Sequence, residues 1–298
     1  MIWKFLHSVR KIIFVVLAIG LPVFIYFGFI AKEPIFEPEY DVEIGRQSVL
    51  SIRQDTIENP LLNEKAYPEA YTYLRSMVSE IADSDAIQYD GIFKYDSIQI
   101  IHRDDILNAF CTPGGYIYVY TGLIHYLDKP DHLAGVIGHE IAHAELRHSA
   151  VRLQKEYGRE RILDLLLVGG AGISGYIQAK IVKDMLTLNY SRDQEADADK
   201  YSVQYLKDTR YACNGAAGFF EKLINQGEDA AILELLSDHP NSAKRVRDIN
   251  QTADRTGCDV TGTDSSDWEE FKSLLPKADA ENGSDVKSDE EAVSSEAK

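Results

Sequence analysis

Two histidines and a glutamate in the segment His139-Glu140-Ile141-Ala142-His143 have the types and spacing of a metal site. Residues four apart on a helix differ by about 40° in direction, so His139 and His143 present both imidazoles to one metal ion. Glu140 points about 80° from their mean direction, which suits a carboxylate acting on a water molecule at the metal. Two neutral nitrogen ligands, an open metal position and a carboxylate base are what a metallopeptidase requires.

A third protein ligand is needed, and the candidates differ in position. Ser149 stands ten residues after the first histidine, where some zinc peptidases carry another histidine. His148 lies about 180° around a continuous helix, which excludes it from the same metal. Glu195 is the better candidate, because Glu195 and Asp199 share one face of a second predicted helix and Asp199 can orient a ligating imidazole. The acids expected on the solvated face of that helix are Asp193 and Asp197.

The elements that position these residues follow from apolar spacing and turn residues. The helix with the two histidines is predicted to begin near Asp131, directly after Pro130, and to continue to about residue 152. Strands are predicted over residues 92–102 and 116–121, the second after a Pro-Gly-Gly turn. Further helical spacing covers residues 45–82, with a turn near Asn59, and residues 189–207, 216–226 and 243–256. The Gly-rich apolar segment 163–179 is interpreted as a closely packed buried helix or a segment that dips into a membrane surface.

The N-terminal region carries an uncharged apolar run, residues 12–30, with Lys4, Arg10 and Lys11 before it and an acidic stretch after it. A helix of that length spans about 28 Å, close to the hydrocarbon core of a bilayer. The charge asymmetry predicts the N-terminus in the cytoplasm and the remainder outside. A cleaved signal peptide is the alternative, although the run is long and no A-x-A-like site follows. The lack of a polar face disfavours a buried core helix.

The resulting organisation has five segments. They are a cytoplasmic N-terminus (1–11), a transmembrane signal anchor (12–31), an extended linker (32–44), a zinc metallopeptidase domain (45–275) and a disordered acidic tail (276–298).

Composition narrows the class of protein further. The chain has 298 residues and a formal net charge of −17, so it repels phosphate backbones and nucleic acid is not an expected partner. Its 45% hydrophobic content excludes a wholly disordered chain. Three cysteines exclude a dense disulfide framework. Cys213 and Cys258 either form one disulfide or stay as two buried thiols, and Cys111 is left over.

With these residues in view, the sequence resembles metallopeptidase family forty-eight, the gluzincins that include Ste-type CAAX prenyl proteases, HtpX, the mitochondrial Oma-type protease, BepA and LoiP. Four blocks match in order, over residues 108–124, 139–149, 191–199 and 238–245. The resemblance implies an α+β, mainly helical zincin-like domain with a small β-sheet beside the active-site helix. A single predicted membrane span makes the chain most similar in layout to the compact periplasmic members, without BepA's repeat module.

The resemblance also implies roles for single residues. It assigns one Zn²⁺ per chain to His139, His143 and Glu195, and the general base to Glu140. It places His239 near the metal, where this residue would stabilise the oxyanion or block a latent site; a helix-initiating turn is the alternative. Arg245 would pair with inner carboxylates such as Asp199, or form a surface salt bridge.

Residues 116–121 resemble the family's edge strand beside the cleft, which can bind an extended substrate backbone. The residues expected to contact substrate are Asn108, Tyr116, Tyr118 and Tyr120. A tyrosine-rich core strand is the alternative, and both can hold because strand faces alternate.

The expected function is that of a membrane-anchored zinc metalloendopeptidase with its catalytic domain on the periplasmic side of the inner membrane. It would hydrolyse membrane or envelope proteins in quality control, or be periplasmic after signal cleavage. Its expected partners are protein or peptide substrates and, through the N-terminal helix, the membrane. A chaperone-like protein that keeps the zinc fold but cuts little is the alternative. A scaffold with a coincidental motif is disfavoured, because it has no reason to supply Glu195 and His239 as well.

Overall fold

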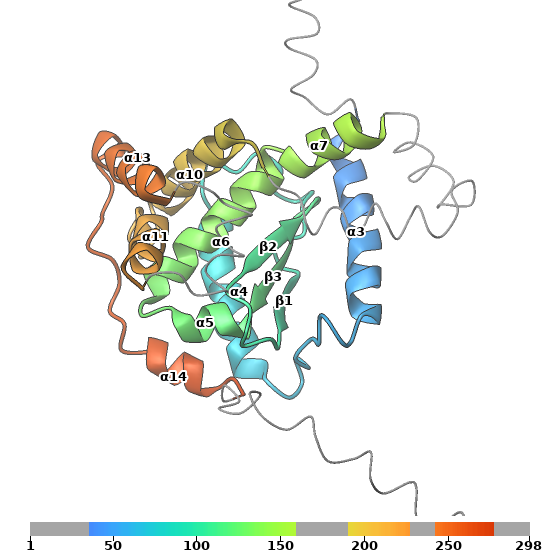
Figure 1. Cartoon of the computed structure of the whole chain (residues 1–298), viewed down its shortest axis with the longest axis horizontal. Coiled ribbons are helices and arrows are strands. Elements are labelled where there is room, and N and C mark those ends of the chain that lie inside the picture. Colours follow the sequence, from blue (N-terminus) through green and yellow to red (C-terminus); the bar gives the residue numbers. More distant parts are fainter. Residues whose placement is uncertain (1–35, 159–189, 227–241, 277–298) are drawn as a thin grey trace, which may run out of the picture.

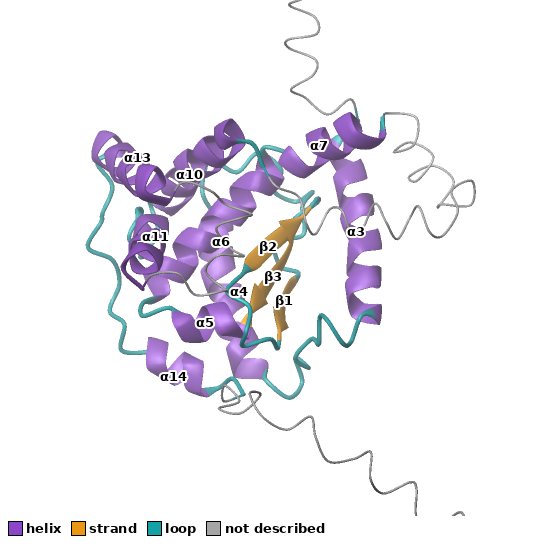
Figure 2. Ribbon diagram, in the orientation of Figure 1, coloured by secondary structure: helices purple, strands orange, loops and turns teal. Residues whose placement is uncertain are grey.

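Three short strands and a surrounding set of helices make up the part of the chain that the computed structural model describes, residues 36–158, 190–226 and 242–276 (Figures 1 and 2). The elements in chain order are α3 (Pro38–Gln54), α4 (Pro68–Ala82), β1 (Ile98–Ile101), β2 (Ala109–Thr112), β3 (Tyr116–Tyr120), α5 (Thr121–Tyr126), α6 (Pro130–Glu145), α7 (His148–Tyr157), α10 (Arg192–Leu206), α11 (Gly215–Gln226), α13 (Ser242–Thr256) and α14 (Trp268–Ser273). The predicted mainly helical α+β class with a small sheet is confirmed.

The sheet has the strand order β1-β3-β2, with β1 parallel and β2 antiparallel to β3. β3 is therefore the central strand, and the prediction that residues 116–121 form an edge strand is wrong. The reason is β2, a strand that apolar alternation did not predict, which turns back through Gly114 (φ 77°) and Gly115 (φ 89°) and pairs with β3. Such left-handed backbone suits glycine. The predicted strand over residues 92–102 shortens to β1.

The two faces of the sheet pack against different helices (Figure 2). Ile117 and Val119 of β3 belong to the large core that includes α6 and α4. Tyr118 and Tyr120 point to the opposite face, where they form a second cluster with Ile52 of α3. The alternation of a strand thus buries both faces of β3, and its tyrosines face away from α6.

Helix α6 lies in the middle of the fold and is buried along almost its whole length. Two glycines allow neighbouring helices to approach it closely. A Cβ atom on Gly135 would lie 2.0 Å from the backbone nitrogen of Ala216 in α11, and one on Gly138 would lie 2.6 Å from the Leu206 side chain of α10. The helix with the two histidines is therefore held from two sides by helices that come later in the chain.

The single helix predicted from Asp131 to about residue 152 is wrong, because α6 ends at Glu145 and α7 starts at His148. Between them Arg147 adopts a left-handed conformation, φ 52°, which costs a residue with a Cβ roughly 1–2 kcal/mol. Its buried guanidinium donates to Asp41 in α3 and, at 2.6 Å, to the carbonyl oxygen of Phe36. These contacts hold the corner in place of the usual glycine.

The N-terminal residues that the structure describes differ from the extended linker predicted over residues 32–44. Pro38 opens helix α3, and Asp41 and Ile44 are buried within it. The helix forms because Asp41 has a buried partner in Arg147 and Ile44 packs inward. Among the described residues no helix is long and apolar enough to cross a bilayer. The predicted anchor at 12–31, the segment 163–179 and the tail from 277 lie outside these residues.

Cys213 and Cys258 form a disulfide that joins residues 45 apart in sequence, whereas Cys111 is a free, buried thiol. The disulfide settles the two alternatives left open by the sequence. It connects the segment just before α11 with the segment just after α13, so these two helices, which pack against each other, are linked covalently.

Candidate metal centre

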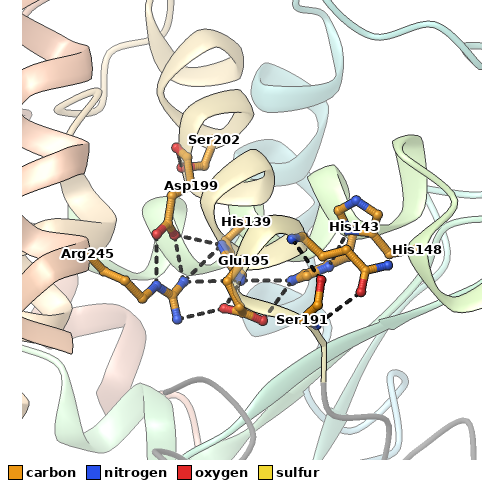
Figure 3. Close-up of polar contacts among 9 residues, drawn as sticks. His139, His143, His148, Ser191, Glu195, Asp199, Ser202 and Arg245 are labelled. Carbon is orange, nitrogen blue, oxygen red and sulfur yellow. Dashed lines mark hydrogen bonds and ion pairs between the residues drawn. The ribbon is translucent and has the colours of Figure 1, made fainter. Parts of the chain in front are cut away.

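Helices α6 and α10 bring His139, His143 and Glu195 together (Figure 3). The Nε2 atoms of the two histidines are 3.0 Å apart. One oxygen of Glu195 lies 3.5 Å from Nε2 of His139, and the other lies 3.5 Å from Nε2 of His143. All three side chains are buried. The ligand set expected from sequence spacing therefore converges on one point.

The size and chemistry of this cluster fit a zinc ion. Bonds of about 2.0–2.1 Å in tetrahedral geometry place ligand atoms about 3.3 Å apart. The observed separations of 3.0 and 3.5 Å lie on either side of this value. Two imidazoles and one carboxylate are also the donor set of many catalytic zinc sites, which leave a fourth position open.

The start of α10 fixes the position of Glu195. Ser191 caps the helix by accepting a hydrogen bond from the backbone N–H of Gln194 (3.3 Å), and the Gln194 side chain accepts one from the backbone N–H of Ser191 (3.0 Å). This capping box satisfies donors that the first turn leaves free. As predicted, Glu195 and Asp199 are buried on the inner face of α10; the two exposed acids are Asp193 and Asp197.

Arg245 of α13 connects the carboxylates of the centre (Figure 3). Its Nε and one terminal nitrogen donate to the two oxygens of Asp199 at 2.8 and 2.6 Å, and its other terminal nitrogen is 2.8 Å from Glu195. Asp199 also contacts Nδ1 of His139 at 3.0 Å. Arg245 is buried, so the structure favours the pairing with inner carboxylates over a surface salt bridge.

The charges of the centre shift its acid–base equilibria. Burial and the charge of Arg245 act to lower the pKa of His139, but hydrogen bonds with Asp199 and Glu195 raise it to about 9. Burial favours a protonated Asp199, yet Arg245 and His139 hold the pKa of that carboxyl below its usual value. Burial lowers the pKa of His143 well below the ordinary value. Asp199 is therefore an anion that can accept a hydrogen bond from His139.

His148 is a residue of the centre whose contact the sequence analysis did not predict. Its Nδ1 lies 2.8 Å from Nδ1 of His143. The ring of Tyr190 stacks on His143 at a centroid distance of 3.8 Å, and its hydroxyl is 2.7 Å from that of Ser149. On a continuous helix His148 would lie on the far side, and the break at Arg147 turns it back toward His143. No glycine or proline in the sequence signals that break.

Glu140 lies in α6, next to His139 in sequence, and lines a small apolar cavity of about 20 Å³ beside His139. Only one of the four predicted substrate-binding residues lines this cavity. Asn108 lines it, whereas Tyr118 and Tyr120 pack in the cluster against α3 and half-buried Tyr116 packs at its border. The remaining residues that line it are Leu107, Ala109, Leu123, Val136, Ala216, Phe219 and Phe220. The α11 residues were not expected from the sequence, since only the packing of α11 on α6 brings them there. His239 lies outside the described residues.

A buried helix with the His-Glu-x-x-His pattern, a glutamate from a second helix that meets the two histidines, and a strand beside them are the arrangement of a zincin-like metallopeptidase domain. Residues 68–253 match the sequence profile described as Peptidase family M48. This match covers more than half of the chain, and the chain belongs to that family.

Individual relatives are similar over about half of the chain. Mitochondrial metalloendopeptidase OMA1 of Schizosaccharomyces pombe is 31% identical over 150 residues, 50% of this chain and 44% of that protein. Metalloprotease LoiP of Escherichia coli is 30% identical over 156 residues, 51% of this chain and 60% of LoiP. The beta-barrel assembly-enhancing protease of Escherichia coli is 27% identical over 169 residues, 52% of this chain and 34% of that protein. The chain thus spans less than two thirds of each relative.

Proposed function

We propose that this chain is a zinc-dependent metalloendopeptidase with one Zn²⁺ held by His139, His143 and Glu195. The observation that carries the proposal is the convergence of two imidazole nitrogens and one carboxylate within 4.8 Å, buried in the fold. Family membership and relatives named as metalloproteases support it. Asp199 and Arg245 support the ligands from outside, since they bond to His139 and Glu195.

A zinc ion held there would supply Lewis-acid chemistry for the hydrolysis of a peptide bond. Glu140 is placed to take a proton from the attacking water and to pass it to the leaving amine. Burial of Glu140 in a largely apolar surrounding limits competition from bulk water. We assign His239 a role in stabilising the oxyanion or in blocking the site in a latent state.

Strand β2 is the proposed place for the substrate backbone. No further strand pairs with it among the described residues, so it is an outer strand of the sheet there. The N–H of Tyr120 donates to the carbonyl oxygen of Asn108, so the alternate residues Ala109 and Cys111 direct their backbone groups away from β3. The N–H of Ala109 donates to Oδ1 of Asn108 at 2.8 Å, so a bound peptide would have to displace that side chain to pair there. An extended peptide can add to this side. Asn108, at the start of this strand, lines the same cavity as Glu140.

We place the catalytic domain outside the cytoplasm, anchored by residues 12–31, or free in the periplasm after signal cleavage. The disulfide between Cys213 and Cys258 supports an oxidising compartment, where such bonds persist. The names of the relatives, one mitochondrial and one linked to beta-barrel assembly, support membrane or envelope proteins as substrates and a role in quality control. Protein or peptide substrates and the membrane are the proposed partners.

The test is metal content and casein cleavage by the full-length chain, compared with Glu140→Gln. One zinc per chain, with cleavage abolished by a chelator and by Glu140→Gln while zinc is retained, is the expected result. Asp197→Asn is the matched control, because this acid is exposed on α10. A folded chain without zinc would refute the proposal. Zinc with no cleavage of any substrate, and an unchanged cellular role for Glu140→Gln, would identify a binding protein instead.

A further inference from the structure

The two ring nitrogens of His143 have separate partners. Nε2 faces the proposed metal position, 3.0 Å from Nε2 of His139 and 3.5 Å from Glu195. Nδ1 faces the other way and lies 2.8 Å from Nδ1 of His148. Both histidines are buried, so solvent does not easily replace this contact.

A hydrogen bond between two Nδ1 atoms needs one donor and one acceptor. A metal at Nε2 of His143 requires a free lone pair on that atom, which places the proton of the neutral ring on Nδ1. His143 is then the donor and His148 the acceptor. The same logic applies to His139, whose Nδ1 lies 3.0 Å from a carboxylate oxygen of Asp199. Each histidine of the cluster thus has one buried acceptor behind it.

The corner between α6 and α7 determines the position of His148. Arg147 takes the left-handed conformation directly before His148 and is held there by Asp41 and the carbonyl oxygen of Phe36. On the other side of the His143 ring, Tyr190 stacks at 3.8 Å. The ring of His143 therefore has little freedom to rotate.

We propose that His148 is a positioning residue, which accepts the Nδ1–H hydrogen bond of His143 and so fixes the tautomer and ring orientation that direct Nε2 to the metal. The inference rests on the proposed metal site. It predicts that the acceptor atom of residue 148, rather than its bulk, determines metal affinity.

Two variants of nearly equal shape separate these contributions. His148→Asn places the amide oxygen where Nδ1 of the imidazole lies, whereas His148→Leu has similar branching and no acceptor. Chelator competition with Zn²⁺ alone, on the full-length chain in mild detergent, measures the affinity. His148→Leu should bind zinc about 10- to 100-fold more weakly, and His148→Asn within about threefold of wild type. With Co²⁺ as the probe, the visible spectrum should change in the leucine variant only.

A control variant tests whether the loss of any buried histidine has this effect. His132→Leu removes a half-buried histidine from the other end of α6 and should leave zinc affinity unchanged. Equal losses in His148→Asn and His148→Leu, or no loss in either, would overturn the inference. If the leucine variant does not fold, His148→Gln replaces it, because its acceptor lies one bond further out and should not rescue.

The same measurements separate this inference from the proposed function. A wild-type chain that binds zinc but cleaves no protein overturns the peptidase activity, while the comparison of asparagine and leucine still decides the role of His148. A wild-type chain that binds no zinc overturns both.

Discussion

Replacing Asp199 by asparagine tests how far the centre depends on its second layer of contacts. The carboxylate accepts two hydrogen bonds from Arg245, at 2.8 and 2.6 Å, and contacts Nδ1 of His139 at 3.0 Å. An amide has the same shape but only one acceptor oxygen, and its NH₂ group repels the N–H group it meets. With the amide oxygen toward His139, Nε of Arg245 loses its acceptor; with the amide turned round, the terminal nitrogen of Arg245 and Nδ1 of His139 both lose theirs.

The structure sets the size of the effect. Removing one partner of a buried ion pair costs about 3–5 kcal/mol, because the other charge stays buried. Arg245 keeps its contact with Glu195 at 2.8 Å, so the cost belongs at the lower end, about 3 kcal/mol. For a domain of this size that corresponds to a fall in Tm of roughly 6–12 °C. In either orientation the neutral amide is a poorer acceptor for His139 than the carboxylate, so zinc binding should also weaken about 10- to 100-fold.

Thermal unfolding of the metal-free chain and chelator competition with Zn²⁺ measure the two effects separately. The matched control is Asp197→Asn, the same chemical change at an exposed position of the same helix, which should alter stability by no more than about 0.5 kcal/mol. If Asp199→Asn unfolds and binds zinc like this control, the assignment of Asp199 as the support of His139 is incorrect.

Three further predictions concern the packing around α6. Gly135→Ala should lower the free energy of unfolding by about 1–3 kcal/mol, because its Cβ would lie 2.0 Å from a backbone atom of Ala216. Denaturant titrations measure this loss, and wild-type stability would contradict the close approach. Replacing Cys213 and Cys258 by serine should lower unfolding free energy by about 4 kcal/mol, and a reductant should have no further effect on that variant. Burial lowers the pKa of His132 below 6.5, so the unfolded chain takes up its proton first as the pH falls; stability should decrease below about pH 6.5, by up to about 1.4 kcal/mol per pH unit, and less steeply in His132→Asn.

The ligand cluster could be predicted from the sequence because it depends on local geometry. The spacing of His139 and His143 determines which side of a helix they share, whatever surrounds that helix. The same argument separated the inner acids Glu195 and Asp199 from the outer ones. Their meeting across α6 and α10 needed a resemblance to known sequences, since spacing within each helix says nothing about the distance between helices.

The corner at Arg147 and the order of the sheet could not be predicted in this way. Arg147 holds a conformation typical of glycine because its side chain bonds to Asp41, 106 residues away in sequence. Strand β2 is only four residues long and gains its stability by pairing with β3. Both features arise from contacts between distant segments, and both changed the prediction for nearby residues. In the structure His148 lies at the candidate metal centre, where it was not expected, and Tyr118 and Tyr120 of β3 lie away from it.

The contact of Arg147 with the carbonyl oxygen of Phe36 has a consequence for where the catalytic domain can act. Through this contact Phe36, the first residue that the structure describes, is already bound to the folded domain. If residues 12–31 form the proposed membrane anchor, only four residues lie between the anchor and Phe36. Fully extended, four residues reach about 13–14 Å. The domain would then stay close to the membrane surface, and a substrate would have to present its cleavage site there.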